Sequence, residues 1–140
     1  MAEPQDHIGQ QFLDRLPYAR ALGLEIVDFS AGEVEMRLPY NSELIGEPET
    51  GVIHGGAVSA LMDTCAGAAV MSHPSGGGTA TLDLRIDYMR AATPGQAICA
   101  RAVCYHVTRS VAFIRATAMD DDRGRPVATA HGAFTVGSSA

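Results

Sequence analysis

The sequence has no lysine. All ten of its basic residues are arginines, and its 16 acidic residues leave a net charge of −6. Non-specific nucleic-acid binding depends on a basic surface, so we expect no nucleic-acid partner for such an acidic chain. A local group of arginines could still hold phosphate, because a guanidinium group binds it through paired hydrogen bonds.

The sequence also lacks any run of 18 or more hydrophobic residues, and its first 30 residues show no signal-peptide pattern. We therefore expect neither membrane insertion nor secretion. The three cysteines, an odd number, argue against a disulfide framework and for a reducing compartment. Together these features predict a cytoplasmic protein.

The 140 residues, 46% of them hydrophobic, are enough for one domain with a real core. We expect this domain to span residues 1–140, with residues 1–22 as a helical N-terminal extension that Pro17 divides into two short helices. Residues 24–38 carry two stretches of strand pattern around a Ser-Ala-Gly turn and predict a β-hairpin. Residues 41–53 are rich in turn-forming residues and glutamate and predict a connecting loop.

The clearest helical pattern runs from His54 to Val70. Its apolar residues follow helical spacing and form one stripe, made of Val58, Leu61, Met62, Cys65, Ala66, Ala69 and Val70. At the start of this helix, Gly55 and Gly56 leave the backbone N–H groups unshielded, and such an N-terminus attracts an oxygen atom or an anion. Asp63 is the only charged residue in the helix and lies beside the apolar stripe, which indicates a functional site.

Four further strands follow the helix. Residues 79–88 alternate strictly between apolar and polar side chains, and residues 96–106, 110–119 and 126–136 form three more strand patterns with short connections. Short connections favour antiparallel neighbours, so these strands and the hairpin predict an α+β fold with an antiparallel sheet curled around the long helix. One helix covers only one face of such a sheet, which leaves the other face and an edge for a partner chain.

Two parts of the sequence carry a family resemblance. The first is the segment Gly51-Val52-Ile53-His54-Gly55-Gly56, followed by Leu61, Asp63 and Gly67, and the second is the strand from Thr81 to Arg90. Together with the closing strands, they resemble the hotdog-fold acyl-CoA thioesterases of the PaaI type over roughly residues 20–136. The resemblance implies a hotdog fold and hydrolysis of the thioester between an acyl group and coenzyme A. It also implies no metal, no cofactor beyond the coenzyme A of the substrate, and self-association as a homodimer or homotetramer.

The resemblance also assigns roles to individual residues. It implies that Asp63 is the nucleophile or the general base that activates water, and that the Gly55 amide polarises the thioester carbonyl. His54 would position the substrate beside it, and Gly56 would also contact the substrate. Thr81 matches a hydroxyl position on the following strand and would orient water.

The substrate-binding residues outside the helix depart from the family pattern at one place. The family often has asparagine or glutamine about six residues before the histidine, where this sequence has Pro48. The neighbouring Glu47 or Glu49 could replace that side chain, or its contact could be missing. Arginines at strand ends, Arg90, Arg109 and Arg123, are candidates for holding the phosphates of coenzyme A.

Helix geometry constrains how Gly55 and Asp63 can cooperate. The two residues are eight positions apart, which is about 12 Å along the helix axis at about 1.5 Å per residue. Attack on a carbonyl needs an approach of about 3 Å, so one chain's Asp63 cannot reach a carbonyl held at its own Gly55. Either the two groups serve different purposes or each site combines two chains, and we expect the second, with a homodimer and two symmetric sites.

Structural interpretations remain open for each of these residues. Asp63 could cap a neighbouring loop, His54 could cap the helix, and Thr81 could be present for its strand propensity alone.

A hydratase or dehydratase of the same fold could pair His54 with Asp63, and a non-catalytic acyl-CoA-binding module could keep the pocket without chemistry. A metal site at Cys99, Cys104 and His106 is not expected, because residues 99 and 104 point to opposite faces of a regular strand.

Overall fold

The computed structural model describes residues 4–137, so residues 1–3 and 138–140 of the predicted domain lie outside the described part. Its helices are α1 (Pro4–Asp14), α2 (Pro17–Leu22), the 3₁₀ helix η1 (Ser42–Leu44) and α3 (Gly55–Ser72). Its strands are β1 (Glu25–Ser30), β2 (Glu33–Leu38), β3 (Ile45–Glu47), β4 (Val52–Ile53), β5 (Thr81–Tyr88), β6 (Ile98–Val107), β7 (Val111–Met119) and β8 (Ala128–Thr135).

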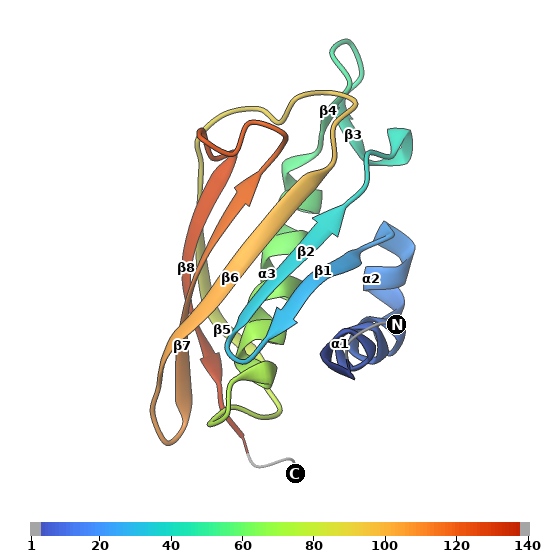
Figure 1. Cartoon of the computed structure of the whole chain (residues 1–140). Coiled ribbons are helices and arrows are strands. Elements are labelled where there is room, and N and C mark those ends of the chain that lie inside the picture. The colour runs from blue at the N-terminus through green and yellow to red at the C-terminus, as the bar shows by residue number, and fades with distance from the viewer. Residues whose placement is uncertain (1–3, 138–140) are drawn as a thin grey trace.

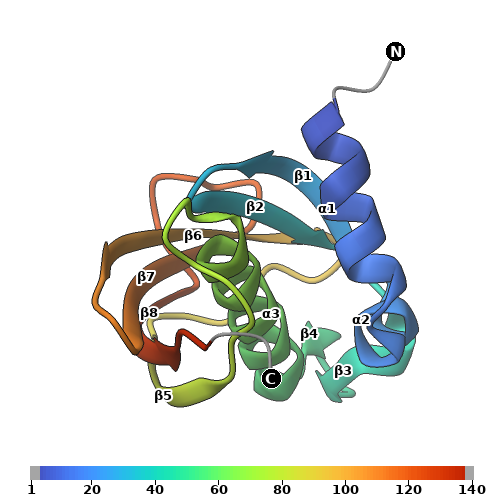
Figure 2. The ribbon, with the colours of Figure 1, turned by 90° about the horizontal axis from the view of Figure 1, so that it is seen from below.

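Six of the strands form one antiparallel sheet in the order β1-β2-β6-β7-β8-β5 (Figure 1). Seen along the helix, the sheet curls over α3, with α1 and α2 at one flank of the helix and β5 at the other (Figure 2). The α+β fold with a curled antiparallel sheet around one long helix is therefore confirmed. No helix within residues 4–137 is long and apolar enough to cross a membrane.

The central helix α3 packs mainly against β2, β6 and β7 through the predicted apolar stripe. Cys65 lies in the middle of this contact, where its thiol donates to the carbonyls of Val34 (3.2 Å) and Ala100 (3.3 Å). Burial raises the pKa of the Cys65 thiol to about 12. The thiol therefore stays protonated at neutral pH and fixes the helix to the sheet.

The predicted N-terminal helices are present over the described residues. Pro17 is the first residue of α2, where its missing N–H breaks no hydrogen bond, and Gly23 ends that helix with a φ of 75°. Helix α1 packs on β1 at Gly9, where an added Cβ would lie 3.1 Å from Phe29. The extension is therefore part of the packed domain.

The predicted loop over residues 41–53 was wrong in detail, because this segment contains η1 and a short β3–β4 hairpin. The hairpin turns at Gly51, which has a φ of 81°. Its base packs closely on the start of α3, since a Cβ added at Gly46 would lie 2.8 Å from the His54 Cα. Strands of two and three residues are too short to produce a visible alternation.

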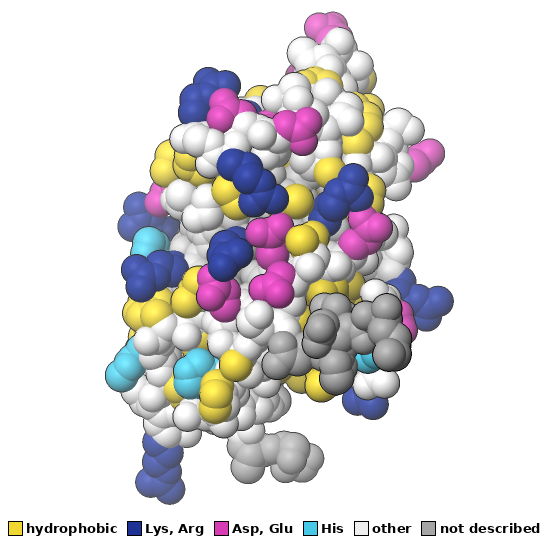
Figure 3. Space-filling view, viewed as in Figure 1, with side chains coloured by type: hydrophobic (Ala, Val, Ile, Leu, Met, Phe, Trp, Pro, Cys, Tyr) yellow, Lys and Arg dark blue, Asp and Glu magenta, His cyan; other side chains and the backbone are white. Residues whose placement is uncertain are grey.

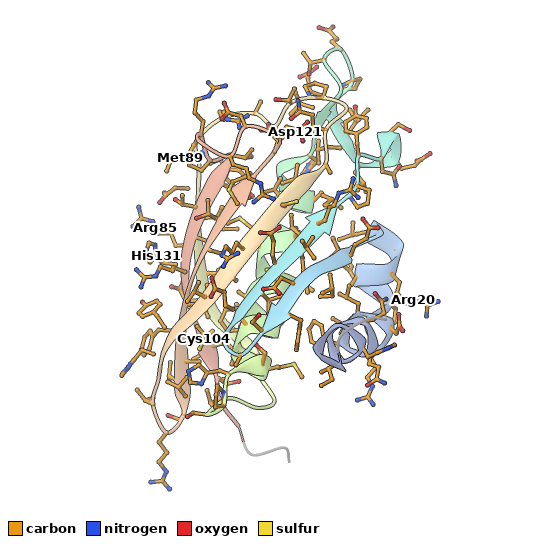
Figure 4. The ribbon with its side chains drawn as sticks, in the orientation of Figure 1. Arg20, Arg85, Met89, Cys104, Asp121 and His131 are labelled. Atoms are coloured by element: carbon orange, nitrogen blue, oxygen red, sulfur yellow. The ribbon has the colours of Figure 1, made fainter. Side chains whose placement is uncertain are left out.

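The edge strand β5 contains a β-bulge beside the central helix. Thr81 pairs with Phe134 and Asp83 pairs with Ala133, so Leu82 is an extra residue and is 58% exposed. Residues directly opposite each other share a face, so Thr81 lies on the inner face with the buried Phe134. Beyond the bulge, Arg85 and its neighbour His131 point away from the helix (Figure 4).

The turn between β7 and β8 is joined to the end of β5 by a buried ion pair. The Arg90 guanidinium donates to both Asp120 carboxylate oxygens at 2.7 and 2.8 Å, and Thr93 donates to the same carboxylate through its N–H and its hydroxyl. The Asp120 side chain is fully buried. The hydrogen bonds from Arg90 make the largest contribution to holding the pKa of Asp120 well below its usual range, and those from Thr93 add to it.

We expect Asp120→Asn to lower the melting temperature by several degrees at neutral pH, because it leaves Arg90 without a charged partner. The lowered pKa in the folded state means that Asp120 stabilises the fold above about pH 4 and loses this contribution as the pH falls below it. The wild type should thus lose stability on acidification more steeply than Asp120→Asn does. Thermal melts followed by circular dichroism between pH 7 and pH 3 measure both effects, and parallel pH profiles would contradict this assignment.

Candidate active site

The Asp63 carboxylate lies on α3 and is held by a single side chain of another element. Thr81 on β5 donates its hydroxyl to Asp63 Oδ1 at 2.6 Å, and Asp63 itself is half-buried. Among the described residues, no arginine or histidine forms an ion pair with Asp63. The bulge in β5 makes this contact possible, because it turns Thr81 toward the helix.

Asp63 and Thr81 line a cavity of about 410 Å³, a size suited to a small organic ligand. Its remaining wall is largely apolar and comes from the N-terminal helices, from α3, from the segment before β5 and from β8. These lining residues are Phe12, Leu16, Tyr18, Ala19, Thr64, Gly67, Met71, Thr79, Ala80 and Phe134. A half-buried carboxylate in a largely apolar wall, held by the Thr81 hydroxyl, makes Asp63 the candidate reacting group of this cavity.

Gly55 lies at the first position of α3 and lines a different cavity, of about 290 Å³. Val58, Tyr88 and Arg90 also line this cavity, and the Tyr88 hydroxyl donates to the Gly55 carbonyl at 2.8 Å. Asp63 does not line it. Within one chain, the predicted carbonyl-binding amide and the predicted carboxylate therefore face separate cavities.

The His54 imidazole caps the start of α3. Its Nδ1 accepts the Gly56 N–H at 2.7 Å, which requires that the neutral ring carry its proton on Nε2. Among residues 4–137, no protein acceptor takes the Gly55 N–H. The cap therefore uses the Gly56 amide and leaves the Gly55 amide for a ligand, and no contact in the described chain joins His54 to Asp63.

The other predicted substrate contacts are spread over the molecule. Glu47 and Pro48 are exposed on the β3–β4 hairpin, which projects beyond the sheet next to the start of α3 (Figure 1). Arg109 is exposed on the β6–β7 turn, at the opposite end of the sheet from that hairpin. Arg123 is 56% exposed and pairs with Glu35 on the outer sheet face, where charged side chains gather over β1, β2 and β6 (Figure 3).

The phosphate-binding role predicted for Arg90 is contradicted by its hydrogen bonds. All five of its N–H groups are used, by the Asp120 carboxylate and by the carbonyls of Ala91 and Arg125. No donor is left for a phosphate, although Arg90 does line the Gly55 cavity. Its guanidinium fixes the turn after β7.

The structure gives no support to a metal site within residues 4–137. No group of three or more histidine, cysteine or acidic side chains is arranged to hold a metal ion there. On β6, Cys104 is buried toward the helix and Cys99 lies on the other face, as expected from their spacing.

Sequence patterns missed two sets of residues near these cavities. Phe12, Leu16 and Tyr18 line the Asp63 cavity, although the sequence predicted only that their segment is helical. Tyr88 ends the alternating strand over residues 79–88, and its hydroxyl donates to the Gly55 carbonyl. The available signal for Phe12, Leu16 and Tyr18 was that an amphipathic helix needs an apolar surface to cover.

Comparisons with known proteins identify the family of this chain. The sequence matches the thioesterase superfamily over residues 50–127, which is more than half of the chain. The chain belongs to the thioesterase superfamily. The matched part contains Gly55, Asp63 and Thr81, whereas the N-terminal helices lie outside it.

Solved structures of other proteins are similar to this superfamily member over nearly its whole length. A Pseudomonas aeruginosa protein is 41% identical, covers 94% of this chain and 98% of its own, and superposes with a TM-score of 0.83. A mutant of the phenylacetic acid degradation protein PaaI from Thermus thermophilus is 28% identical over 86% of this chain and 98% of its own, with a TM-score of 0.76. The hotdog fold and the resemblance to PaaI-type proteins are confirmed.

Curated relatives of this superfamily member match over a shorter region. The medium/long-chain acyl-CoA thioesterase YigI of Salmonella typhimurium is 25% identical over 97 residues, 59% of this chain. A Halobacterium salinarum relative is 37% identical over 87 residues. The matches span 63% and 58% of these two relatives.

The capping role of His54 can be separated from a role in chemistry. We expect His54→Ala to lower the free energy of unfolding by about 0.5–2 kcal/mol, the usual effect of losing a helix cap. His54→Asn should restore most of this loss, because asparagine accepts the same N–H. Urea denaturation of the three proteins measures it, and equal stability of wild type and His54→Ala would refute the capping role.

Proposed function

We propose that this chain hydrolyses acyl-CoA thioesters, with the Asp63 carboxylate as nucleophile or general base. The observation that supports this most directly is a carboxylate that forms no ion pair within the described chain, oriented by the Thr81 hydroxyl, in the wall of an apolar cavity. Membership of the thioesterase superfamily and the similarity to YigI, an acyl-CoA thioesterase by name, support the reaction class.

In the general-base route, Asp63 removes a proton from water while the water oxygen attacks the thioester carbonyl carbon. In the nucleophilic route, a carboxylate oxygen attacks first and forms a mixed anhydride, which water then hydrolyses. Either route breaks the carbon–sulfur bond, and the thiolate of coenzyme A takes up a proton as it leaves. A thioester has a good leaving group, so a carboxylate can perform this step without a histidine relay.

The proposed electrostatic help comes from the start of α3. The Gly55 N–H is free of protein acceptors in the described chain and lies at the positive end of the helix dipole. A carbonyl oxygen bound there would gain negative charge during attack, and a preorganised donor stabilises that charge. The Gly56 N–H already donates to His54 Nδ1, so Gly56 would contact the substrate through its other backbone atoms rather than through its N–H.

We further propose that each active site combines Asp63 of one chain with Gly55 of another in a homodimer. Two observations support this: the two groups line separate cavities in one chain, and β5 is an unpaired edge strand with Leu82 and Tyr88 more than half exposed. A two-fold axis beside β5 would extend the sheet and create two equivalent sites. Two such dimers could associate further into a homotetramer.

The remaining assignments of this proposal concern coenzyme A and the cell compartment. Arg109, Arg123, Glu47 and Pro48 stay candidates for contacts with coenzyme A, and no metal or further cofactor is required. The cysteines of the described chain are free, which supports a reducing, cytoplasmic compartment. A hydratase would need a basic His54, but its Nδ1 already accepts an N–H and its Nε2 carries the proton.

We expect Asp63→Asn to lower thiol release from acyl-CoA by 100-fold or more, because it keeps the shape of the side chain and removes its basicity. Thr81→Val should lose about tenfold, since it removes a hydrogen bond to a charged group, and Thr81→Ser should retain most activity. Asp83→Asn, which changes an exposed carboxylate on the same strand, is the matched control. Full activity of Asp63→Asn would rule out the proposed chemistry.

The Gly55 amide and the shared site can be tested together. Gly55→Pro removes the N–H at a position that accepts a proline ring, because proline suits the first helical position and the polyproline-type backbone of His54 (φ −57°, ψ 135°) is permitted before proline. Gly55→Ala keeps the N–H and is the control, since its Cβ would meet Tyr88 at an ordinary 3.5 Å. We expect Gly55→Pro to be about 100-fold slower and Gly55→Ala to be active.

Mixing the two inactive proteins, Asp63→Asn and Gly55→Pro, after reversible dissociation should restore about a quarter of wild-type activity. Each mixed dimer would contain one site with both an intact Asp63 and an intact Gly55. A site formed within one chain would show no recovery on mixing. Size-exclusion chromatography of each mixture confirms that dimers have re-formed.

A further inference from the structure

The Asp63 cavity has an apolar neighbour beneath helix α1. This second cavity measures about 260 Å³ and is lined by Ile8 and Phe29, among others. Phe12 and Met71 line both cavities, so these two side chains lie between them. Removing or moving them would join the two spaces into one longer channel that leads away from Asp63.

We propose that the two cavities bind an unbranched apolar acyl chain end to end, and that Phe12 and Met71 set the chain length that the site accepts. The thioester carbonyl would lie at Asp63, and the chain would run along α3 past Met71 and under α1. The substrate class is therefore medium- to long-chain aliphatic acyl thioesters. This inference rests on the proposed function, because it takes Asp63 as the reacting end.

The helix itself defines the path of the chain. Asp63, Gly67 and Met71 are spaced by four residues, so they follow one another along one face of α3 over about 12 Å. Gly67 is in the interior of the helix, where glycine is less favourable than alanine. Its missing side chain leaves space in the Asp63 cavity, since a Cβ there would meet Phe134 at 3.8 Å.

The chemistry of the walls selects an uncharged aliphatic group. Among the residues that the structure describes, Asp63 is the only charged one that lines either cavity. In the second cavity, the Ser72 hydroxyl is already satisfied by the Gly32 N–H and the Ala69 carbonyl. A polar group at the end of the acyl chain would lie in the second cavity and lose its water there, whereas each buried methylene should raise affinity about fourfold.

The test compares wild type with variants that close the path. In Gly67→Leu the new side chain fills part of the Asp63 cavity. In Met71→Phe a larger side chain blocks the passage between the two cavities, at a position that is 45% exposed and therefore tolerates substitution. Val27→Ala is the matched control, because Val27 is 48% exposed and lines neither cavity. Thermal melts check that each variant is folded.

Thiol release is measured with butanoyl-, octanoyl- and hexadecanoyl-CoA. We expect kcat/KM of the wild type and of Val27→Ala to rise at least tenfold from butanoyl- to hexadecanoyl-CoA. The loss of kcat/KM in Gly67→Leu and Met71→Phe should be at least tenfold larger with hexadecanoyl-CoA than with butanoyl-CoA. A chain-length profile in both variants that equals the wild-type profile would overturn the channel.

Calorimetric binding of the non-hydrolysable thioethers S-butyl-CoA and S-hexadecyl-CoA separates this inference from the proposed reaction. If no protein releases thiol but wild type binds the hexadecyl thioether more tightly and both variants lose this preference, the reaction is wrong and the channel stands. If thiol is released but the thioether affinities do not depend on chain length, the channel is wrong and the reaction stands.

Discussion

The close packing of α3 against the curled sheet depends on small side chains. Alanines contribute to both surfaces of this contact, and all of them are buried: Ala66 and Ala69 on α3, and Ala100, Ala102 and Ala116 on the strands. Short side chains bring the helix so near to β2 and β6 that the Cys65 thiol reaches carbonyls on both strands. No charged side chain of α3 could be accommodated on this side, so the charge of Asp63 must lie where the sheet does not cover the helix.

The position of Asp63 follows from that constraint. Its cavity is lined by the N-terminal helices and by Thr81 of β5, and Figure 2 shows these elements on opposite flanks of α3. The carboxylate is carried by a helix whose opposite face is locked in the core, and its orientation is fixed from β5 by Thr81. A reacting group held by two packed elements keeps its geometry without rearrangement during the reaction, which is what preorganised catalysis requires. The same strand leaves an unpaired edge, so the arrangement that orients Asp63 also offers the surface for a second chain.

Sequence periodicity was sufficient for the fold because the core face of α3 and five of the strands repeat at helical or strand spacing with few interruptions. It was insufficient for the inner face of β5. Strict alternation groups Thr81 with Asp83 and places both away from the helix, and the apolar Leu82 continues the pattern without a break. Only the pairing with β8 reveals the bulge. At the bulge the Asp83 carbonyl oxygen comes close to Gly132, where an added Cβ would lie 2.5 Å from that oxygen, so the close approach needs a glycine. The partner of Arg90 was equally hidden, since Asp120 is 30 residues away in the sequence.

The two parts of the candidate site have different origins in the chain. Gly55, Asp63 and Thr81 belong to the region that matches the thioesterase superfamily, whereas Phe12 and Leu16 come from helices outside it. The residues proposed for the chemistry are fixed by the core, because a shift of α3 would disturb its contacts with three strands. Of the residues proposed to contact the acyl chain, Gly67 and Met71 lie on α3 itself, whereas Phe12 and Leu16 belong to the outer helices, whose side chains can change volume without altering that core. Acyl preference can therefore vary between related proteins through these outer helices while the reaction stays the same.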